Sequence, residues 1–452
     1  MTGETRALAN FCSNLNFDKL PQEAVDKAKE CLLDWLGSAL GGSNLLPAVI
    51  VSGLIKELGG STESTIINHV GKTSCINAAL ANGVMSHILE LDDVHRNSII
   101  HPAAPVIPAA LALAERNRAN GKVLTTAIVV GYEAAIRIGE AVGPSHYKFW
   151  HNTGTCGTFG AATASGKVLG LNEEWMANAL GTAGTQASGL WQFMAEGAMS
   201  KHLHPGRAAM NGVLSALLAE RRFTGSTTIL EGERGFCLAT SSNPKFHKIT
   251  EDLGKKLKIL ETSFKVHASC RHTHSPVDAI MRIQEDDKIA IEDIASVRVE
   301  TYPDAVKIAG NNDPRTPYEA KFSLKYCVST ALSKGRLSLD EFSESLIADR
   351  EIRGLMERCE IVVNPKLSDV YPARWPSIVE IVTKNGKRYK ASVDYPRGDP
   401  ENAISVEELT NKFRTLAIRA LSEDSIEKII NAISRLEEMS DVRQLTKLLR
   451  TR

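Results

Sequence analysis

The stretch TTAIVVGYEAAIRIGEAVG, residues 125–143, carries the pattern that decides the fold. Its apolar residues recur at three- and four-residue spacing, which predicts a helix. The stretch is rich in alanine and glycine and poor in aromatic residues. Small side chains let helix backbones approach closely, and apolar residues on most faces imply burial. We therefore expect this helix to lie inside a large, tightly packed bundle.

The same texture extends through the first half of the chain, up to about residue 225. Pro21 suits the start of one such helix and Gly41-Gly42 its end. Asn172 suits the N-cap of another. Helices with this pattern are predicted over residues 21–42, 172–190 and 206–225.

The pattern of apolar residues changes near residue 260 from helical spacing to a mixture of strand and helix patterns. Strands are indicated by alternating or apolar β-branched runs at 294–303, 358–365 and 377–396. The last of these contains Asn385-Gly386, the strongest short signal for a hairpin. Helices are predicted between the strands at 274–287 and 318–335, and again beyond about residue 403, at 405–421 and 425–439.

These patterns predict a mainly α protein with two domains. A single core stops growing at roughly 250–300 residues, and this chain has 452. Residues 1–264 and 400–452 are expected to form an all-helical domain built from both chain ends. Residues 265–399 are expected to form a smaller α+β domain.

Charge and cysteine usage narrow the class of protein. Lys+Arg and Asp+Glu are both 53, and this balance argues against a nucleic-acid partner. The eight cysteines show no CxxC spacing, which argues against structural zinc and favours reduced thiols in a cytoplasmic compartment. We find no secretory signal at the start and no uncharged apolar run of about 18 residues, so no membrane partner is expected.

The segment ELDDVHRNSIIHP, residues 90–102, is the first candidate site. It crowds together the titratable residues Glu90, Asp92, Asp93, His95 and His101. A metal site, an acid–base site and a solvated loop all fit such a cluster. A proline-stiffened loop at a helix end favours a functional site.

Two further segments join histidines to helix starts. In WHNTGTCGTFGAA, residues 150–162, His151 precedes a Thr/Gly run whose exposed N–H groups could bind an anion. In MSKHLHPGRAAMNG, residues 199–212, Lys201, His202, His204 and Arg207 are expected to precede a helix. Cations are unfavourable at that end of a helix, so the arrangement makes sense if an anion is bound. A basic surface turn is the alternative.

The remaining candidates fall at the expected domain junction and beyond it. KVHASCRHTHSPVDA, residues 265–279, holds His267, Arg271, His272 and His274, and ligand clefts favour such junctions. Its His-x-His pair could bind a metal, although it lacks partners at ligand spacing. The helix predicted at 318–335 carries Tyr318, Lys321, Lys325 and Tyr326, which are more often surface or core residues.

Taken together, histidines with nearby carboxylates and cations favour proton chemistry on a small anion. The chain has no serine elbow, P-loop or HExxH motif. Two other classes stay open. One is a metal-dependent hydrolase that uses Asp92, Asp93, His95, His101 and the His-x-His pairs. The other is a helical binding protein without activity.

In order and content, these segments resemble the MmgE/PrpD family, which includes 2-methylcitrate dehydratase, cis-aconitate decarboxylase and iminodisuccinate epimerase. The resemblance covers nearly the whole chain. It rests on residues 91–115, 151–162, 201–212, 270–279 and 320–332. It implies a large helical domain with an α+β lid domain, a homodimer, a small polycarboxylate substrate, and no metal or organic cofactor.

The resemblance also implies roles for single residues. His101, His151, Lys201, His274 and Tyr326 match catalytic positions, and Asp93 would orient a histidine or Lys201. Arg271, with a guanidinium fork suited to carboxylates, would bind substrate. Glu90, Asp92, His204 and Arg207 are the other residues expected to bind substrate. Glu90 and Val94 depart from the decarboxylase pattern Asp-Phe-Asp-Asp-Thr, so a hydroxyl is lost there.

We therefore expect a cofactor-free lyase that removes a proton alpha to a carboxylate. A histidine would act as acid or base, and cations would hold the developing charge. The main hypothesis is dehydration of a 2-methylcitrate-like hydroxy-polycarboxylate. Decarboxylation of a cis-aconitate-like acid and epimerisation of an iminodisuccinate-like acid share the first step and are the alternatives.

Overall fold

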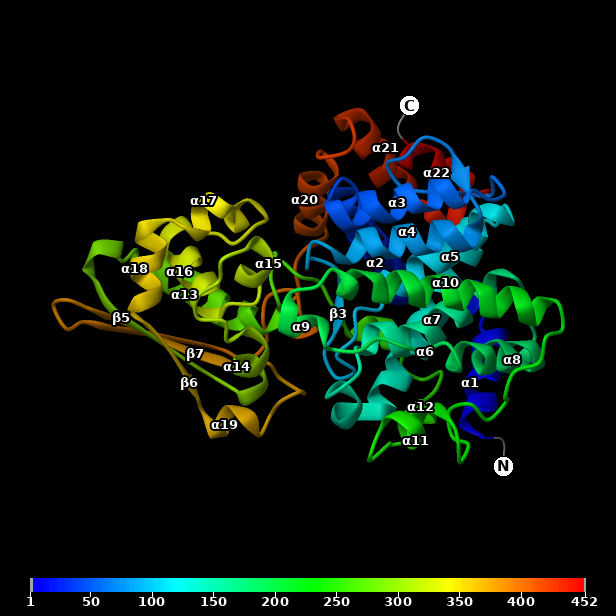
Figure 1. Ribbon diagram of the computed structural model, residues 1–452, viewed down its shortest axis with the longest axis horizontal. Helices are drawn as coiled ribbons and strands as arrows, with labels where there is room; N and C mark the ends of the chain where they lie inside the picture. Colours follow the sequence, from blue (N-terminus) through cyan, green and yellow to red (C-terminus); the bar gives the residue numbers. More distant parts are fainter. Residues whose placement is uncertain (1–2, 451–452) are drawn as a thin grey trace. The chain divides into compact units, whose positions relative to one another are not determined.

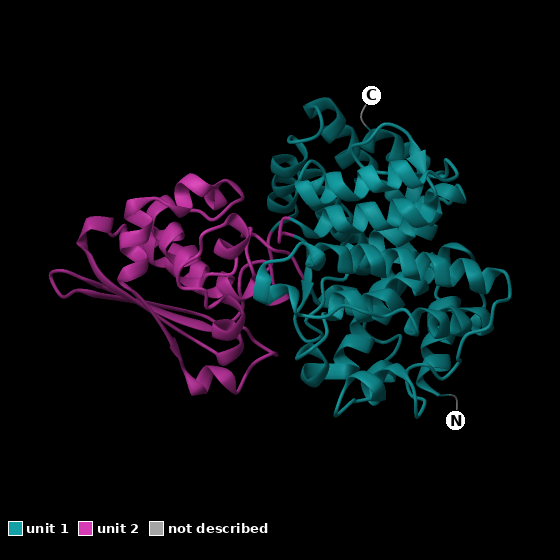
Figure 2. Ribbon diagram, in the orientation of Figure 1, with its two compact units in different colours: residues 1–88, 92–262, 405–452 teal, residues 89–91, 263–404 magenta. Residues whose placement is uncertain are grey.

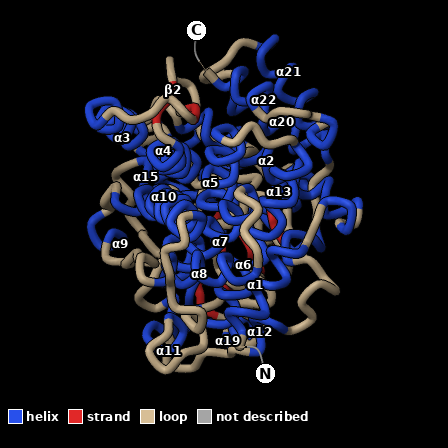
Figure 3. The backbone as a smooth tube through the Cα atoms, turned by 90° about the vertical axis from the view of Figure 1, so that its right-hand side faces the viewer, coloured by secondary structure: helices blue, strands red, loops and turns tan. Residues whose placement is uncertain are grey.

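The computed structural model describes residues 3–450, which fold into two compact units (Figure 2). Unit 1 holds the described residues within 1–88, 92–262 and 405–452, and unit 2 holds residues 89–91 and 263–404. The chain is mainly helical, as its sequence predicts, and Figure 3 shows helix as the prevailing element. The predicted boundaries at 264/265 and 399/400, and the role of residues 265–399 as a lid, stay predictions.

Unit 1 is built of helices with a few two-residue strands. The short strands are β1 (Ser64–Thr65), β2 (Lys72–Thr73) and β3 (Val94–His95), while β4 (Thr262–Ser263) lies where the chain passes into unit 2. The helices are α1 (Glu4–Asn14), α2 (Gln22–Gly42), α3 (Leu46–Leu58), α4 (Cys75–His87), α5 (Ala103–Arg116), α6 (Gly121–Tyr147), α7 (Asn152–Val168), α8 (Glu173–Gly184), α9 (Phe193–Glu196), α10 (Ser200–Glu220), α11 (Phe236–Thr240), α12 (His247–Thr250), α20 (Val406–Ala417), α21 (Glu423–Ser434) and α22 (Arg443–Thr446).

Helix α7 forms the centre of unit 1. Residues 152–166 are all buried, and α5, α6, α8 and α10 pack around them (Figure 1). Small residues permit this packing: a Cβ added at Gly160 would lie 2.7 Å from the carbonyl oxygen of Gly131 on α6. The alanine- and glycine-rich texture of the sequence therefore reflects close backbone contact between buried helices.

Glycines also set the approach of α4 to α10. A Cβ added at Gly83 would lie 2.8 Å from Gly206 Cα, and one added at Gly206 would lie 2.6 Å from the carbonyl oxygen of Leu80. This contact is one turn before the end of α4 and about one turn after the start of α10. It therefore holds the C-terminus of α4 against the first turns of α10.

Replacing Gly83 by alanine should lower the free energy of unfolding by roughly 1–3 kcal/mol, the usual cost of overpacking. The atoms that a new methyl group meets are backbone atoms, which cannot swing aside. Gly53→Ala is the control, because no atom lies within 4 Å of its added Cβ and alanine favours the helix. Urea unfolding of both variants checks this, and equal stability of the two would contradict the packing argument.

The C-terminal helices belong to the same unit. Helix α20 packs on α2, and a capping box of Ser405 and Glu408 begins it. Lys412 Nζ lies 2.6 Å from Asp34 Oδ1, and the Asp34 carboxylate is fully buried. Burial raises the pKa of Asp34, while Lys412 opposes the rise. The two ends of the chain are thus joined by a buried ion pair.

Unit 2 combines a four-stranded sheet with helices. The strands are β5 (Ile294–Thr301), β6 (Cys359–Val363), β7 (Ser377–Thr383) and β8 (Arg388–Val393). They lie in the order β6-β5-β7-β8, with β5 and β6 parallel and the other pairs antiparallel. The helices are α13 (His274–Asp287), α14 (Pro303–Ala309), α15 (Pro317–Ala320), α16 (Leu324–Lys334), α17 (Glu344–Ile347), α18 (Arg350–Glu357) and α19 (Pro365–Ser368).

The sheet confirms the strands predicted from sequence, including the hairpin at Asn385-Gly386, where Gly386 has a φ of 85°. Helix α13 packs on β7 and β8, which explains the alternating burial along β7. One prediction was wrong. The helix expected over 318–335 is divided into α15 and α16, because the Ser323 hydroxyl accepts from Tyr326 N and starts a new helix.

All eight cysteines are free and buried. Burial raises the pKa of Cys156, Cys327 and Cys359 to about 12. Thiols with such pKa values react slowly, because the thiolate is the reactive form.

Within residues 3–450 no single helix is long and apolar enough to cross a membrane. Helices α2 and α3 reach the necessary length and hydropathy only when they are taken together, and they are bent by 86° relative to each other.

Candidate active site

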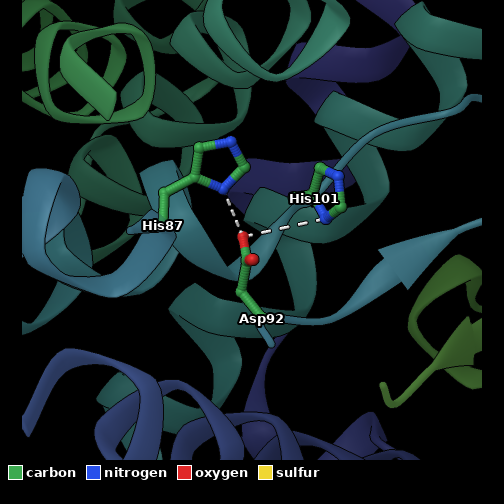
Figure 4. Close-up of side chains that lie close together, drawn as sticks. All are labelled: His87, Asp92 and His101. Atoms are coloured by element: carbon green, nitrogen blue, oxygen red, sulfur yellow. Dashed lines mark hydrogen bonds and ion pairs between the residues drawn. The ribbon is translucent and has the colours of Figure 1, made fainter. Parts of the chain in front are cut away.

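The acid-rich segment, residues 90–102, contacts the C-terminus of α4 through Asp92. His87, the last residue of that helix, donates from Nδ1 to Asp92 Oδ2 at 2.6 Å. His101 approaches the same carboxylate, with Nδ1 3.7 Å from Asp92 Oδ2. Figure 4 shows both imidazoles beside the Asp92 carboxylate. The three residues therefore form one contact group, with the carboxylate shared between two histidines.

A backbone carbonyl fixes the tautomer of His101. Its Nδ1 lies 2.6 Å from the carbonyl oxygen of Asp93. A carbonyl oxygen only accepts, so the proton of the neutral ring is on Nδ1 and the lone pair is on Nε2. The backbone N–H of His101 donates to Thr153 Oγ1 at 3.1 Å. His101 is thus held from two sides as a ring whose Nε2 can take a proton.

The Asp93 carboxylate has partners other than the histidines, and the predicted role of Asp93 in orienting a histidine or Lys201 stays a prediction. Asp93 Oδ1 accepts from Ala103 N at 3.0 Å, and Oδ2 accepts from the Tyr132 hydroxyl at 2.7 Å. Burial raises the pKa of Asp93 well above its ordinary value, with Asp34 and Asp92 adding to the rise. Asp93 orients His101 through its backbone carbonyl, and Asp92 is the acid whose carboxylate contacts the histidines.

Helices α7 and α10 supply a second pair of histidines. His151, the N-cap of α7, lies with Nδ1 3.1 Å from Nδ1 of His204 on α10, so one ring donates and the other accepts. Burial lowers the pKa of His151 well below its usual value, and His87, His204 and Lys201 lower it further. Burial, His87 and Lys201 lower the pKa of His204 to about 4. Both rings are therefore neutral at pH 7.

His87 lies at the centre of this group. Its ring centroid is 5.0 Å from that of His101, 5.6 Å from that of His151 and 6.5 Å from that of His202. We call His87, His101, His151, His202 and His204 the histidine cluster. Helices α5, α7 and α10 all begin beside it, and helix N-termini attract anions. The cluster is thus suited to a negatively charged ligand.

The start of α10 differs from the sequence prediction. The helix begins at Ser200, so Lys201, His202 and His204 lie within its first turns instead of before it. Lys201 is buried, whereas Arg207 is exposed on the same side of α10 as Leu203. The prediction that Arg207 binds substrate is therefore not supported by its position. Lys201 is the α10 cation that acts electrostatically on His151 and His204.

In unit 2, the Arg271 guanidinium has partners within the same unit, and its predicted role in binding a substrate carboxylate stays a prediction. Its guanidinium forms an ion pair with Asp399 and donates to the carbonyl oxygen of Arg397 at 3.0 Å. It also donates to His274 Nδ1 at 2.9 Å. The buried Asp399 thus satisfies the charge that was expected to bind substrate.

His274 and Tyr326 have internal partners as well. Because Arg271 occupies Nδ1 of His274, the proton of that ring is on Nε2, which lies 3.4 Å from the carbonyl oxygen of Ser269. Burial and Arg271 lower the pKa of His274 well below its usual value. The Tyr326 hydroxyl donates to the Glu341 carbonyl oxygen at 2.5 Å. Both contacts are structural, and the catalytic roles of these residues stay predictions.

Glu90 has a partner that sequence reasoning missed. Lys265 Nζ lies 3.5 Å from Glu90 Oε2, and both side chains are buried in unit 2. Glu90 adopts a left-handed backbone conformation with a φ of 59°, which is uncommon for residues other than glycine. Its predicted contact with substrate stays a prediction, but its charge is opposed by a lysine 175 positions later in the chain.

The set of metal ligands proposed for a hydrolase is divided between two places. His95 lies 3.2 Å from Glu261 and 4.0 Å from Glu140, and Lys258 contacts both glutamates. Asp92 and His101 instead group with His87, their ligand atoms lying within 4.8 Å of one another. The ligand atoms of this second group lie close enough to hold a metal ion, although Asp92 Oδ2 already accepts from His87 Nδ1 at 2.6 Å.

His87 is the functional candidate that the sequence did not single out, because it falls inside an apolar helical run. Its spacing of five residues before Asp92 was the available signal.

Models of known protein families match most of this chain. A model of the MmgE/PrpD N-terminal domain matches residues 6–249, and a model of the MmgE/PrpD C-terminal domain matches residues 267–438. The chain belongs to the MmgE/PrpD family.

Named relatives of this MmgE/PrpD protein are enzymes of the lyase type, which confirms that prediction. Cis-aconitate decarboxylase from Aspergillus terreus is 27% identical, over 99% of this chain and 96% of its own length. Cis-aconitate decarboxylase from Homo sapiens is 26% identical, over 99% and 94%. The 2-methylcitrate dehydratase of Escherichia coli (strain K12) is 22% identical, over 94% and 93%.

Proposed function

We propose that this MmgE/PrpD protein removes a proton alpha to a carboxylate of a small polycarboxylate and then expels water, as a 2-methylcitrate dehydratase does. The observation that carries the proposal is the tautomer of His101. Its Nδ1 is bonded to the Asp93 carbonyl, so Nε2 holds the lone pair that a general base needs. That base lies at the N-termini of helices, where a polyanion is attracted.

The chemistry follows from these groups. His101 Nε2 takes the alpha proton, and the electron pair of that C–H bond forms the new double bond as the carbon–oxygen bond breaks and the leaving hydroxyl accepts a proton from an acid of the site to depart as water. Negative charge grows on the substrate carboxylate during the first part of this step. Lys201 and the N-terminal N–H groups of α7 and α10 stabilise such charge because they are already oriented. The neutral histidines at 151 and 204 can donate hydrogen bonds without holding a second proton.

Decarboxylation of a cis-aconitate-like acid is the second candidate. It is favoured by relatives of that name that match this chain over nearly the full length of both proteins. Residue 94 argues against it, since Val94 is buried and has no hydroxyl where the decarboxylase pattern has threonine. Epimerisation would need only the first proton transfer and a return of the proton to the other face.

The test is incubation of the purified protein with 2-methylcitrate, citrate, cis-aconitate and iminodisuccinate in deuterium oxide, followed by NMR. Dehydration gives an unsaturated acid, decarboxylation releases carbon dioxide, and epimerisation introduces deuterium without net loss. Chelator treatment is run in parallel, because activity that disappears with metal would favour the hydrolase class. Absence of both deuterium exchange and turnover with every acid would reject the proposal.

Lys201→Ala should raise KM for the substrate and also lower kcat, with a combined loss of roughly 10- to 100-fold in kcat/KM. A hydrogen bond to a charged group contributes about 1.5–3 kcal/mol, and the developing enolate strengthens it. Steady-state kinetics measure both parameters. Arg207→Ala is the matched control, since Arg207 is a cation of the same helix on its exposed side. Similar losses in the two variants would contradict the assignment of Lys201.

Three finer points are part of the proposal. Unit 2 would act as a lid over the substrate, the protein would form a homodimer, and it would need no metal or organic cofactor. A cytoplasmic location is supported by the eight unpaired cysteines, which suit a reducing compartment. Light scattering of the purified protein tests the dimer directly.

A further inference from the structure

Among the described residues, only one of the two ring nitrogens of His87 has a hydrogen-bond partner. The side chain is fully buried, and Nδ1 donates to Asp92 Oδ2 at 2.6 Å. A carboxylate only accepts, so Nδ1 carries a proton. Among the residues that the structure describes, none forms a hydrogen bond with His87 Nε2. A buried polar atom left in this way is unfavourable unless a ligand supplies the missing partner.

The surroundings of that nitrogen are polar and titratable. The rings of His101, His151 and His202 stand around His87 at centroid distances of 5.0, 5.6 and 6.5 Å. Lys201 is near enough to the same group to act on His151. The unbonded nitrogen of His87 therefore lies in the part of unit 1 that is suited to an anionic substrate.

A second buried histidine shows that an unbonded nitrogen alone means little. His146 is also fully buried, with Nε2 2.8 Å from Thr155 Oγ1 and with Nδ1 unbonded among the described residues. Its ring neighbours are Trp150 and Phe236, and no carboxylate is bonded to it. His146 is thus a packed core histidine, and the contrast with His87 lies in the Asp92 carboxylate and the histidines around it.

We propose that His87 is a second catalytic residue, the acid that protonates the leaving hydroxyl from Nε2, with Asp92 as its positioning residue. The inference rests on the proposed dehydration. The Asp92 carboxylate places a negative charge against His87, accepting from Nδ1 at 2.6 Å, whereas His101 Nδ1 is bonded to a neutral carbonyl and lies 3.7 Å from that carboxylate. These environments suit His87 to the role of proton donor and His101 to the role of proton acceptor.

Protons are conserved in the proposed step. His101 Nε2 removes the alpha proton, the carbon–carbon double bond forms, and the carbon–oxygen bond breaks. The leaving oxygen takes the proton of His87 Nε2 and departs as water. The enzyme then has one more proton on His101 and one fewer on His87, so return of a single proton from His101 to His87 restores the starting state.

The experiment compares His87→Gln with the matched control His146→Gln. Dehydration and exchange of the alpha proton are measured on the same substrate in deuterium oxide. His87→Gln should lower kcat for dehydration by about 10²-fold or more, the usual contribution of a general acid. Exchange of the alpha proton should persist within about fivefold, because His101 is intact. His146→Gln should keep both rates close to wild type.

Other outcomes separate the alternatives. Retention of kcat within about threefold in His87→Gln, or parallel loss of exchange and dehydration, would overturn the role of His87. Recovery of His87→Ala activity by added imidazole would support it. Where His87→Gln does not fold, Asp92→Asn provides the same test, since it removes the charge behind His87 and keeps the shape. Wild-type protein that neither exchanges nor dehydrates any polycarboxylate rejects the proposed function itself.

Discussion

His101→Gln should lose turnover by about 10²- to 10⁴-fold, the range for removal of a general base, with KM changed little. Glutamine can still donate to the Asp93 carbonyl, so the local fold is kept while the lone pair of Nε2 is removed. In the proposed mechanism Lys201 and the helix N-termini bind the substrate, and the change leaves them in place. Steady-state kinetics, and loss of alpha-proton exchange in deuterium oxide, measure the effect.

His95→Gln is the control for this prediction. It makes the same replacement six residues earlier in the same segment, at a buried histidine bonded to Ser98 and Glu261. Its thermal stability should fall as much as that of His101→Gln, but its exchange rate should stay close to wild type. If the two variants lose exchange to the same extent, disruption of the segment explains the loss and His101 is not the base.

The free energy of unfolding should fall steeply as the pH drops below about 6.5. Burial lowers the pKa of His146 and His204 to about 4, that of His272 to about 3, and those of His151 and His274 well below the usual value. The unfolded chain binds these protons from about pH 6.5 downward and the folded chain does not, so stability is present above that pH and is lost below it.

Unfolded histidines are only half protonated at pH 6.5, so each such group removes about 1 kcal/mol between pH 6.5 and 5.5, and the five together remove roughly 5 kcal/mol. Buried carboxyls with raised pKa values, such as Asp93 and Glu133, oppose the trend in part. Urea unfolding at several pH values gives the slope. His272→Gln should reduce proton uptake on unfolding by about one. A flat profile would contradict the burial of these rings as neutral groups.

Local structure was predictable because it depends on neighbours in sequence. The pattern of residues 274–287 gave the bounds of α13, and Asn385-Gly386 gave the hairpin. The helix expected over 318–335 failed because a single serine hydroxyl can cap a new helix as well as lie inside an old one. The predicted helix at 206–225 starts too late, since α10 begins at Ser200 and continues through Pro205.

The site was less predictable because it depends on partners far apart in the chain. Arg271 is paired with Asp399, 128 residues later, and no local signal marks that contact. Asp92 and Asp93 are adjacent and chemically identical, so only the direction of each side chain assigns one to the histidines and the other to Tyr132. His87 was overlooked because a histidine at the end of an apolar helix is indistinguishable from core until its neighbours are known.

The eight buried cysteines can report when different parts of the folded chain open to solvent. Each thiol is buried in the folded protein, and burial raises the pKa of Cys156, Cys327 and Cys359 to about 12, which keeps them in the unreactive thiol form. Alkylation at a given position therefore reports the moment at which that part of the fold is exposed. Cys75 and Cys156 lie in unit 1, and Cys327 and Cys359 lie in unit 2, so mass spectrometry of the labelled peptides can time the opening of each unit separately without any engineered probe.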